Sequence, residues 1–207
     1  MLIEVHPITP QQRVLNSIKE ALSQGELVIL PGDSGYFLAC NLADRKALQA
    51  LHDVSGRPKE KLTSVLFKDI SSMNEFALIN NFAFRIMRQV LPGPFTIVLK
   101  AAHKFPKVML TRRKTIGVRW PCHVFIDALL AILDAPLAVA SIRQSEENDM
   151  GDPHEIHDRL SHAVHAVVSM GELKYEPTTV ISLVDDIPIL LRQGQGEIKD
   201  TSWLVPV

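Results

Sequence analysis

The sequence predicts an α/β domain with a mostly buried, mixed sheet. Short apolar runs of strand length alternate with amphipathic segments of helix length along the whole chain. The 207 residues are 46% hydrophobic and 22% charged, a composition typical of soluble globular domains. We found no repeat, low-complexity tract or linker, so we expect one domain over residues 1–207.

The N-terminal elements follow from spacing and from turn residues. Residues 11–24 place apolar side chains at helical spacing, and Gly25 is suited to end that helix. Residues 26–30 are a continuous apolar run that predicts a strand, which Pro31 and Gly32 are expected to stop.

The rest of the chain continues the alternation. Asp44 is a suitable N-cap for a second helix, which ends near Gly56. The later helices are predicted over residues 80–90, 124–133 and 153–164. The later strands are predicted over residues 64–67, 95–99, 115–119, 137–141, 166–169, 180–184 and 189–192.

Charge excludes one class of protein and leaves another open. With 22 basic and 23 acidic residues, the chain cannot bind nucleic acid by bulk charge. Residues 100–123 nevertheless carry seven basic and no acidic side chains, and residues 146–158 carry six acidic and no Lys or Arg side chains. The basic stretch is either a phosphate-binding surface or one of two solvated surfaces of opposite sign.

Targeting, redox and metal signals are weak. The N-terminus lacks a basic segment followed by an apolar one, and no apolar run approaches the ~20 residues of a membrane span, so we expect a cytoplasmic protein. Cys40 and Cys122 are predicted to be reduced thiols without metal-site spacing. The histidines in residues 154–165 do not share one helical face, so no metal site is predicted.

Four segments could carry chemistry. In the turn after the first strand, Ser34 and Tyr36 either face a ligand or belong to a turn in which Asp33 caps backbone amides. Arg57 and Lys61 either hold phosphates or form a solvated loop.

The other two segments lie at strand ends. Arg119 either grips a carboxylate or forms an interior salt bridge. Thr178, Thr179 and Arg192 place hydroxyls and a guanidinium beside a proline and a glycine at the last two strands.

Together these signals resemble one family. PGDSGYFLAC (31–40), LPGPFTIVLKA (91–101), KTIGVRWP (114–121), PLAVAS (136–141) and TTVISLVDDIPILLRQGQG (178–196) resemble, in order, the motifs of the YrdC/YciO family of L-threonylcarbamoyladenylate synthases, most closely its YciO-like branch. The resemblance implies a twisted, mixed open sheet with flanking helices and a large concave face.

The resemblance also implies a reaction and a site. ATP, bicarbonate and L-threonine would give threonylcarbamoyl-AMP and pyrophosphate, toward the t6A modification of tRNA. Mg²⁺ would enter with ATP, and no tightly bound cofactor is implied. Phosphates would be held by Arg57, Lys61, Thr115, Ser141, Thr178, Thr179 and Arg192. Threonine would be held by Ser34, Tyr36 and Arg119, and we expect the Arg119 guanidinium to open into a pocket beside Ser34 and Ser141.

Departures from the family pattern predict weakened activity. Ser55 replaces a phosphate-binding lysine, Gly32 replaces a threonine, Phe37 replaces a glycine, and Arg143 replaces an asparagine. The alternative is a non-catalytic paralogue that binds nucleotide and double-stranded RNA or tRNA. Its RNA contacts would come from Lys104, Lys107, Arg112, Arg113 and Lys114.

Overall fold

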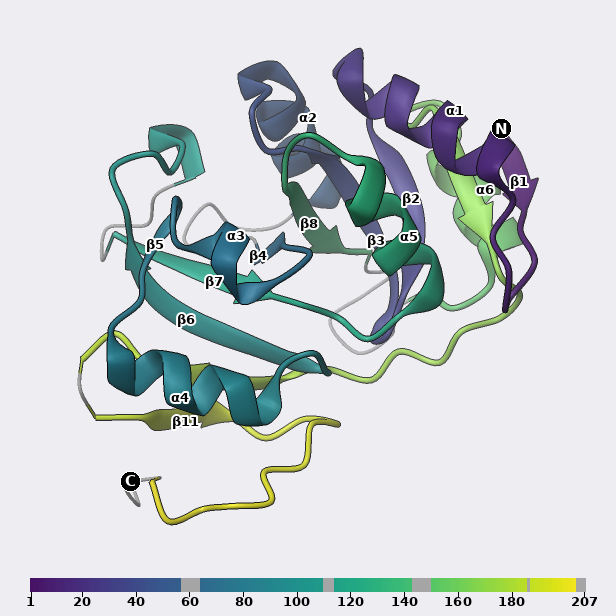
Figure 1. Ribbon diagram of the computed structural model, residues 1–207. Coiled ribbons are helices and arrows are strands. Elements are labelled where there is room, and N and C mark those ends of the chain that lie inside the picture. Colours follow the sequence, from purple (N-terminus) through teal and green to yellow (C-terminus); the bar gives the residue numbers. More distant parts are fainter. Residues whose placement is uncertain (57–63, 110–113, 143–149, 186, 204–207) are drawn as a thin grey trace.

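The fold is an α/β architecture around one continuous mixed sheet (Figure 1). The computed structural model describes residues 1–56, 64–109, 114–142, 150–185 and 187–203. Within these residues the sheet has 11 strands in the order β1-β9-β2-β3-β8-β4-β7-β6-β10-β11, with β5 paired to β6. In Figure 1 strands β6 and β7 run across the direction of β2 and β3, so the sheet is strongly twisted.

The elements alternate along the chain. The strands are β1 (Leu2–Glu4), β2 (Val28–Gly32), β3 (Gly35–Asn41), β4 (Ser64–Leu66), β5 (Ala77–Leu78), β6 (Phe95–Ala101), β7 (Thr115–Arg119), β8 (Leu137–Ser141), β9 (Ala166–Ser169), β10 (Thr179–Ser182) and β11 (Ile189–Arg192). The helices are α1 (Gln12–Ser23), α2 (Arg45–Ser55), α3 (Ile70–Met73), α4 (Asn81–Val90), α5 (Val124–Ile132) and α6 (Pro153–Leu160), with a 3-10 turn η1 (Lys107–Met109).

Helices cover both faces of the sheet. On one face Ile18 of α1 and Leu129 of α5 pack against strand residues such as Leu30. On the other face the apolar sides of α2, α4 and α6 pack against a second set, which includes Leu38 and Ile97. Burial of both faces explains why several strands read as continuous apolar runs. No helix in the described ranges is long and apolar enough to cross a bilayer.

The predicted fold class is confirmed, and the main error concerns β3. We expected Pro31 and Gly32 to stop the strand, but β2 continues through both residues and pairs with β3 by Pro31↔Tyr36 and Gly32↔Gly35. Proline is tolerated there because the pairing of β2 with β9 covers only Val28 and Ile29, so the missing N–H interrupts no ladder on that side. The short elements β1, α3 and β5 were also not predicted.

Candidate functional site

The β2–β3 hairpin holds the first predicted site residues. Its loop is Asp33 and Ser34, and Gly35 follows with a positive φ of 95°. A side chain at Gly35 would be strained in this conformation, and its Cβ would lie 3.3 Å from the backbone of Tyr175. The glycine therefore permits both the tight turn and the close approach of the segment around Tyr175.

A buried ion pair fixes the hairpin against the end of β7. The Arg119 guanidinium pairs through Nη2 with Oδ1 of Asp33, and the two side chains are each 8% exposed. The same Nη2 donates to the Ser34 hydroxyl over 3.0 Å. Asp33 Oδ2 and Arg119 Nε are buried without a hydrogen-bond partner among the described residues. An ion pair thus joins two residues that are 86 positions apart in the sequence.

This arrangement answers part of one expectation. Arg119 does lie beside Ser34, and its guanidinium is ion-paired with Asp33. The physical reason is that a buried guanidinium needs a counter-charge, and Asp33 is the carboxylate that the fold places against it. Of the two interpretations of Arg119, the structure shows the interior salt bridge. Its opening into a pocket beside Ser141 stays a prediction.

Tyr36 has its hydroxyl occupied inside the protein. It donates to the carbonyl of Gly171 over 2.6 Å and accepts from the Met170 amide over 3.0 Å. Burial raises the pKa of Tyr36, partly opposed by its hydrogen bonds to Met170 and Ser169. This residue joins β3 to the end of β9, and a threonine-binding role for it stays a prediction.

His123 and Asp127, at the start of α5, add two titratable groups near Asp33. Burial lowers the pKa of His123, although the charge of Asp33 opposes the shift. Burial also raises the pKa of Asp127, and the charge of Asp33 adds to that shift. Nδ1 of His123 is buried without a hydrogen-bond partner among the described residues.

The lowered pKa of His123 predicts a pH dependence of stability. The folded protein holds this imidazole neutral, whereas the unfolded chain takes up a proton near the ordinary pKa of 6.5. Below that pH the unfolded state binds more protons, so we expect the free energy of unfolding to fall from pH 6.5 down to the folded pKa.

Urea unfolding of the wild type and of His123→Gln across this pH range measures how steeply the free energy of unfolding changes with pH. The His123→Gln slope should be smaller, and His154→Gln, at an exposed position on α6, should retain the wild-type slope. Equal slopes for the wild type and His123→Gln would contradict the assignment.

Thr178, Thr179 and Arg192 form a second cluster. Arg192 donates to the carbonyl of Thr178 from Nε and Nη2, over 3.1 and 2.8 Å. The Thr178 hydroxyl is hydrogen-bonded to that of Thr96 over 2.8 Å. The fully buried Thr179 hydroxyl donates to the Gly196 carbonyl over 2.7 Å and accepts from the Gly194 amide over 2.9 Å. The predicted residues are therefore brought together, and Arg192 is an exposed cation held by its neighbours.

Gln195 connects the two clusters and was not singled out from the sequence. Its side-chain amide donates to the carbonyls of Asp33 and Glu176, over 2.7 and 3.2 Å. It therefore ties the segment before β10 to the hairpin turn. Only its place in the motif after β11 could have drawn attention to it.

The structure describes only some of the remaining residues that we predicted to hold phosphates. Ser55 and Ser141 share a cleft of about 50 Å³ with Arg159 of α6. The Ser55 hydroxyl is hydrogen-bonded to the carbonyl of His52 over 3.0 Å. Thr115 is buried at the start of β7. The predicted residues Arg57, Lys61 and Arg143 lie outside the described residues.

The basic stretch is only partly described. Lys104 is paired with Glu75 and lies 5.4 Å from the centroid of the Phe76 ring. Lys107 belongs to η1, and Lys114 precedes β7 with a positive φ of 52°. Arg112 and Arg113 lie outside the described residues. These positions give the RNA-binding prediction no geometric support.

Two departures in the hairpin motif are coupled in space. A Cβ on Gly32 would lie 2.3 Å from Cε1 of the Phe37 ring, which is 3% exposed. The Phe37 ring in this position therefore requires glycine at position 32. The aromatic ring of Phe37 occupies the space in which a side chain at position 32 would lie.

Comparisons with known proteins agree with the fold. The sequence model Sua5_yciO_yrdC, described as "Telomere recombination", matches residues 20–194. The chain is 36% identical over 197 residues to "Uncharacterized protein YciO" of Escherichia coli (strain K12), covering 94% of this chain and 96% of that one. The crystal structure of E. coli YciO superposes with a TM-score of 0.91 at 35% identity, covering 96% and 98% of the two chains.

A more distant relative carries an activity in its name. "Threonylcarbamoyl-AMP synthase" of Pyrococcus abyssi (strain GE5 / Orsay) is 26% identical over 186 residues, which are 89% of this chain and 55% of that protein. The similarity thus spans most of this chain and about half of the archaeal one.

Proposed function

The chain belongs to the Sua5/YciO/YrdC family, and on that premise we propose that it is a nucleotidyltransferase of the threonylcarbamoyl-AMP synthase type with weakened activity. The observation that carries the proposal is the range of the family match. Residues 20–194 include every residue assigned above to the nucleotide and to the amino acid. The name of the P. abyssi relative supports the reaction type.

In the proposed reaction, the amine of L-threonine and bicarbonate form a carbamate with loss of water. A carbamate oxygen then attacks the α-phosphorus of ATP, and the bond to the leaving pyrophosphate breaks. This chemistry needs cations around the phosphates and correct positioning of the carbamate, and it needs no protein nucleophile. The buried Cys40 fits this requirement, because burial raises the pKa of its thiol to about 12.

Arg192 is the described residue best prepared to contact a phosphate. Two of its nitrogens are held by Thr178, and the described residues give Nη1 no partner. A guanidinium that is already oriented loses less side-chain entropy when it binds an anion. We assign Arg57, Lys61, Thr115, Ser141, Thr178 and Thr179 to the same nucleotide by the family match.

Threonine would bind near the hairpin. Ser34 is 8% exposed and already accepts from Arg119, so we propose Ser34 as the contact and Arg119 as a positioning residue. The ion pair between Arg119 and Asp33 then serves to hold the turn. The described residues bring together no group of three His, Cys, Asp or Glu side chains that could hold a metal. We propose that Mg²⁺ enters with ATP and binds through the phosphates and water, because these ligands can complete its octahedral coordination.

Pyrophosphate release with ATP, bicarbonate and L-threonine tests the proposal. We expect slow release that depends on threonine. Arg57→Ala and Arg192→Ala should each lower it roughly tenfold or more, because each removes one charged contact to phosphate. Ser55→Lys should raise it by restoring the family's cation. The matched control is Arg45→Ala, an exposed arginine on α2, which should leave the rate unchanged.

The opposite outcomes are equally specific. A rate of pyrophosphate release that is unchanged in both Arg57→Ala and Arg192→Ala would show that these residues do not bind the phosphates. Threonine-independent release, or no release in any variant including Ser55→Lys, would exclude the synthase reaction. Isothermal titration with ATP would then show whether nucleotide binding remains.

A further inference from the structure

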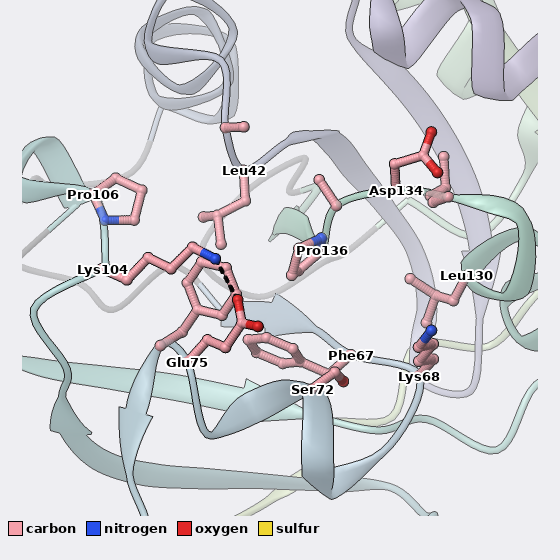
Figure 2. Close-up of a pocket in the computed structure, with 14 residues that line it drawn as sticks. Leu42, Phe67, Lys68, Ser72, Glu75, Lys104, Pro106, Leu130, Asp134 and Pro136 are labelled. Atoms are coloured by element: carbon pink, nitrogen blue, oxygen red, sulfur yellow. Dashed lines mark hydrogen bonds and ion pairs between the residues drawn. The ribbon is translucent and has the colours of Figure 1, made fainter.

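A cavity of about 520 Å³ lies apart from the site described above (Figure 2). Its walls are mainly apolar and include two aromatic rings, Phe67 and Phe76, whose centroids are 5.7 Å apart. Leu42 and Pro136 lie near the centre of the view, and Leu130 of α5 lines the cavity at the right of the view. The volume falls within the range of about 300–1,000 Å³ that is usual for small-molecule sites.

The topology separates this cavity from Ser34 and Ser141, whereas the backbone amide of its wall residue Phe67 donates to the carbonyl of Arg119 over 2.9 Å. Strands β3, β4 and β8 connect the two regions. Ser34 lies just before β3, and Ser141 is the last residue of β8. Leu42 and Phe67 instead follow the ends of β3 and β4, and Pro136 precedes the start of β8. Because β8 runs antiparallel to β3 and β4, the cavity lies at the other end of all three strands.

Within the described part of the chain, each charged side chain that lines the cavity has an ion-pair partner, except that of Lys68. Glu75 is paired with Lys104, as the dashed line in Figure 2 shows. Asp134 is paired with Lys19 over 3.2 Å. Lys68 also lines the cavity, is exposed, and has no hydrogen bond or ion pair within the described part of the chain. Glu75 and Asp134 are thus each paired with a lysine, Asp134 with Lys19 from outside the cavity lining, and Lys68 is the charged lining residue that has no partner among the described residues.

We propose that this cavity is a binding site for a small aromatic carboxylate. The ring of the ligand would lie against Phe76, Phe67 and Pro136, where apolar area is removed from water. Its carboxylate would pair with Lys68. A cationic ligand is disfavoured because both carboxylates at the cavity already have partners. The proposal is independent of the synthase reaction.

The experiment uses 2-naphthoate as the probe and the full chain. Isothermal titration should show saturable binding, and two-dimensional amide NMR should place the largest shifts at Lys68, Ser72 and Ala135 rather than at Ser55 and Ser141. Lys68→Met should weaken binding about fivefold, which corresponds to one partly exposed ion pair of about 1 kcal/mol. Ala43→Trp should abolish binding, because Ala43 is an exposed residue of the cavity mouth that a larger side chain can fill without disturbing the core.

Two controls distinguish the contribution of the ion pair with Lys68 from nonspecific apolar binding. Lys46→Met removes an exposed lysine on α2 that does not line the cavity, and it should leave the affinity unchanged. The neutral analogue 2-naphthol should bind more weakly than 2-naphthoate and should be insensitive to Lys68→Met. Absence of saturable binding, NMR shifts centred on Ser141, or equal affinities of wild type and Lys68→Met for 2-naphthoate would each overturn the proposal.

Discussion

Replacing Arg119 by methionine is expected to destabilise the protein by about 3–5 kcal/mol, because the carboxylate of Asp33 would then be buried without a counter-charge. Arg119 is 6% exposed, so water cannot take the place of the guanidinium without rearrangement. Urea unfolding followed by circular dichroism measures the loss. Threonine-dependent pyrophosphate release should fall as well, because the Ser34 hydroxyl loses the donor that holds it.

A double-mutant cycle identifies the cause. Asp33→Asn combined with Arg119→Met removes both charges, and it should recover part of the stability lost in Arg119→Met alone. The matched control is Lys174→Met, which breaks the exposed pair of Lys174 with Glu176 and should cost less than about 1 kcal/mol. Additive effects of the two substitutions in the Asp33–Arg119 cycle would mean that the ion pair does not hold the hairpin.

Introducing a side chain at Gly32 is expected to cost about 2–3 kcal/mol, because the new Cβ would overlap the buried ring of Phe37. The overlap is at 2.3 Å from Cε1, and the ring packs within a core that leaves it 3% exposed. Thermal or urea unfolding of Gly32→Ala measures the loss. The same reason explains why a threonine at this position would be incompatible with Phe37.

The partner substitution provides the control. Phe37→Leu replaces the ring by a smaller side chain and should be destabilising by itself, since it leaves space in the core. In Gly32→Ala/Phe37→Leu that space accepts the new methyl group, so the double variant should be more stable than the sum of the single effects predicts. Strict additivity would show that the two departures from the family motif are unrelated.

Local signals in the sequence were sufficient for most helices and strands. Asp44 accepts from the amides of Lys46 and Ala47 and so caps α2, as its position before an apolar periodic segment predicted. Strands β7 and β8 cover the residues predicted for them. These features depend on neighbours within a few residues, and that information is present in any short window of the chain.

Strand β3 was not predictable in this way. Pro31 and Gly32 usually interrupt a strand, and here they remain in β2 because β3 pairs with them on one side, while the pairing of β2 with β9 on the other side stops at Ile29. Which sides of a strand are paired is a property of the whole sheet. The local pattern therefore indicated the turn and missed the strand that follows it.

The ordered motifs in the sequence determined the family and, with the alternation of elements, the fold class. They also identified Thr178, Thr179 and Arg192 as a group, which the structure brings together by hydrogen bonds. Only the tertiary structure decided that Arg119 is paired with Asp33, that Gln195 joins the two clusters, and that Lys68, beside an apolar cavity, has no partner among the described residues. The reason is physical: a side chain's chemical type is written in the sequence, but its burial and its counter-charge depend on segments far along the chain that folding places against it.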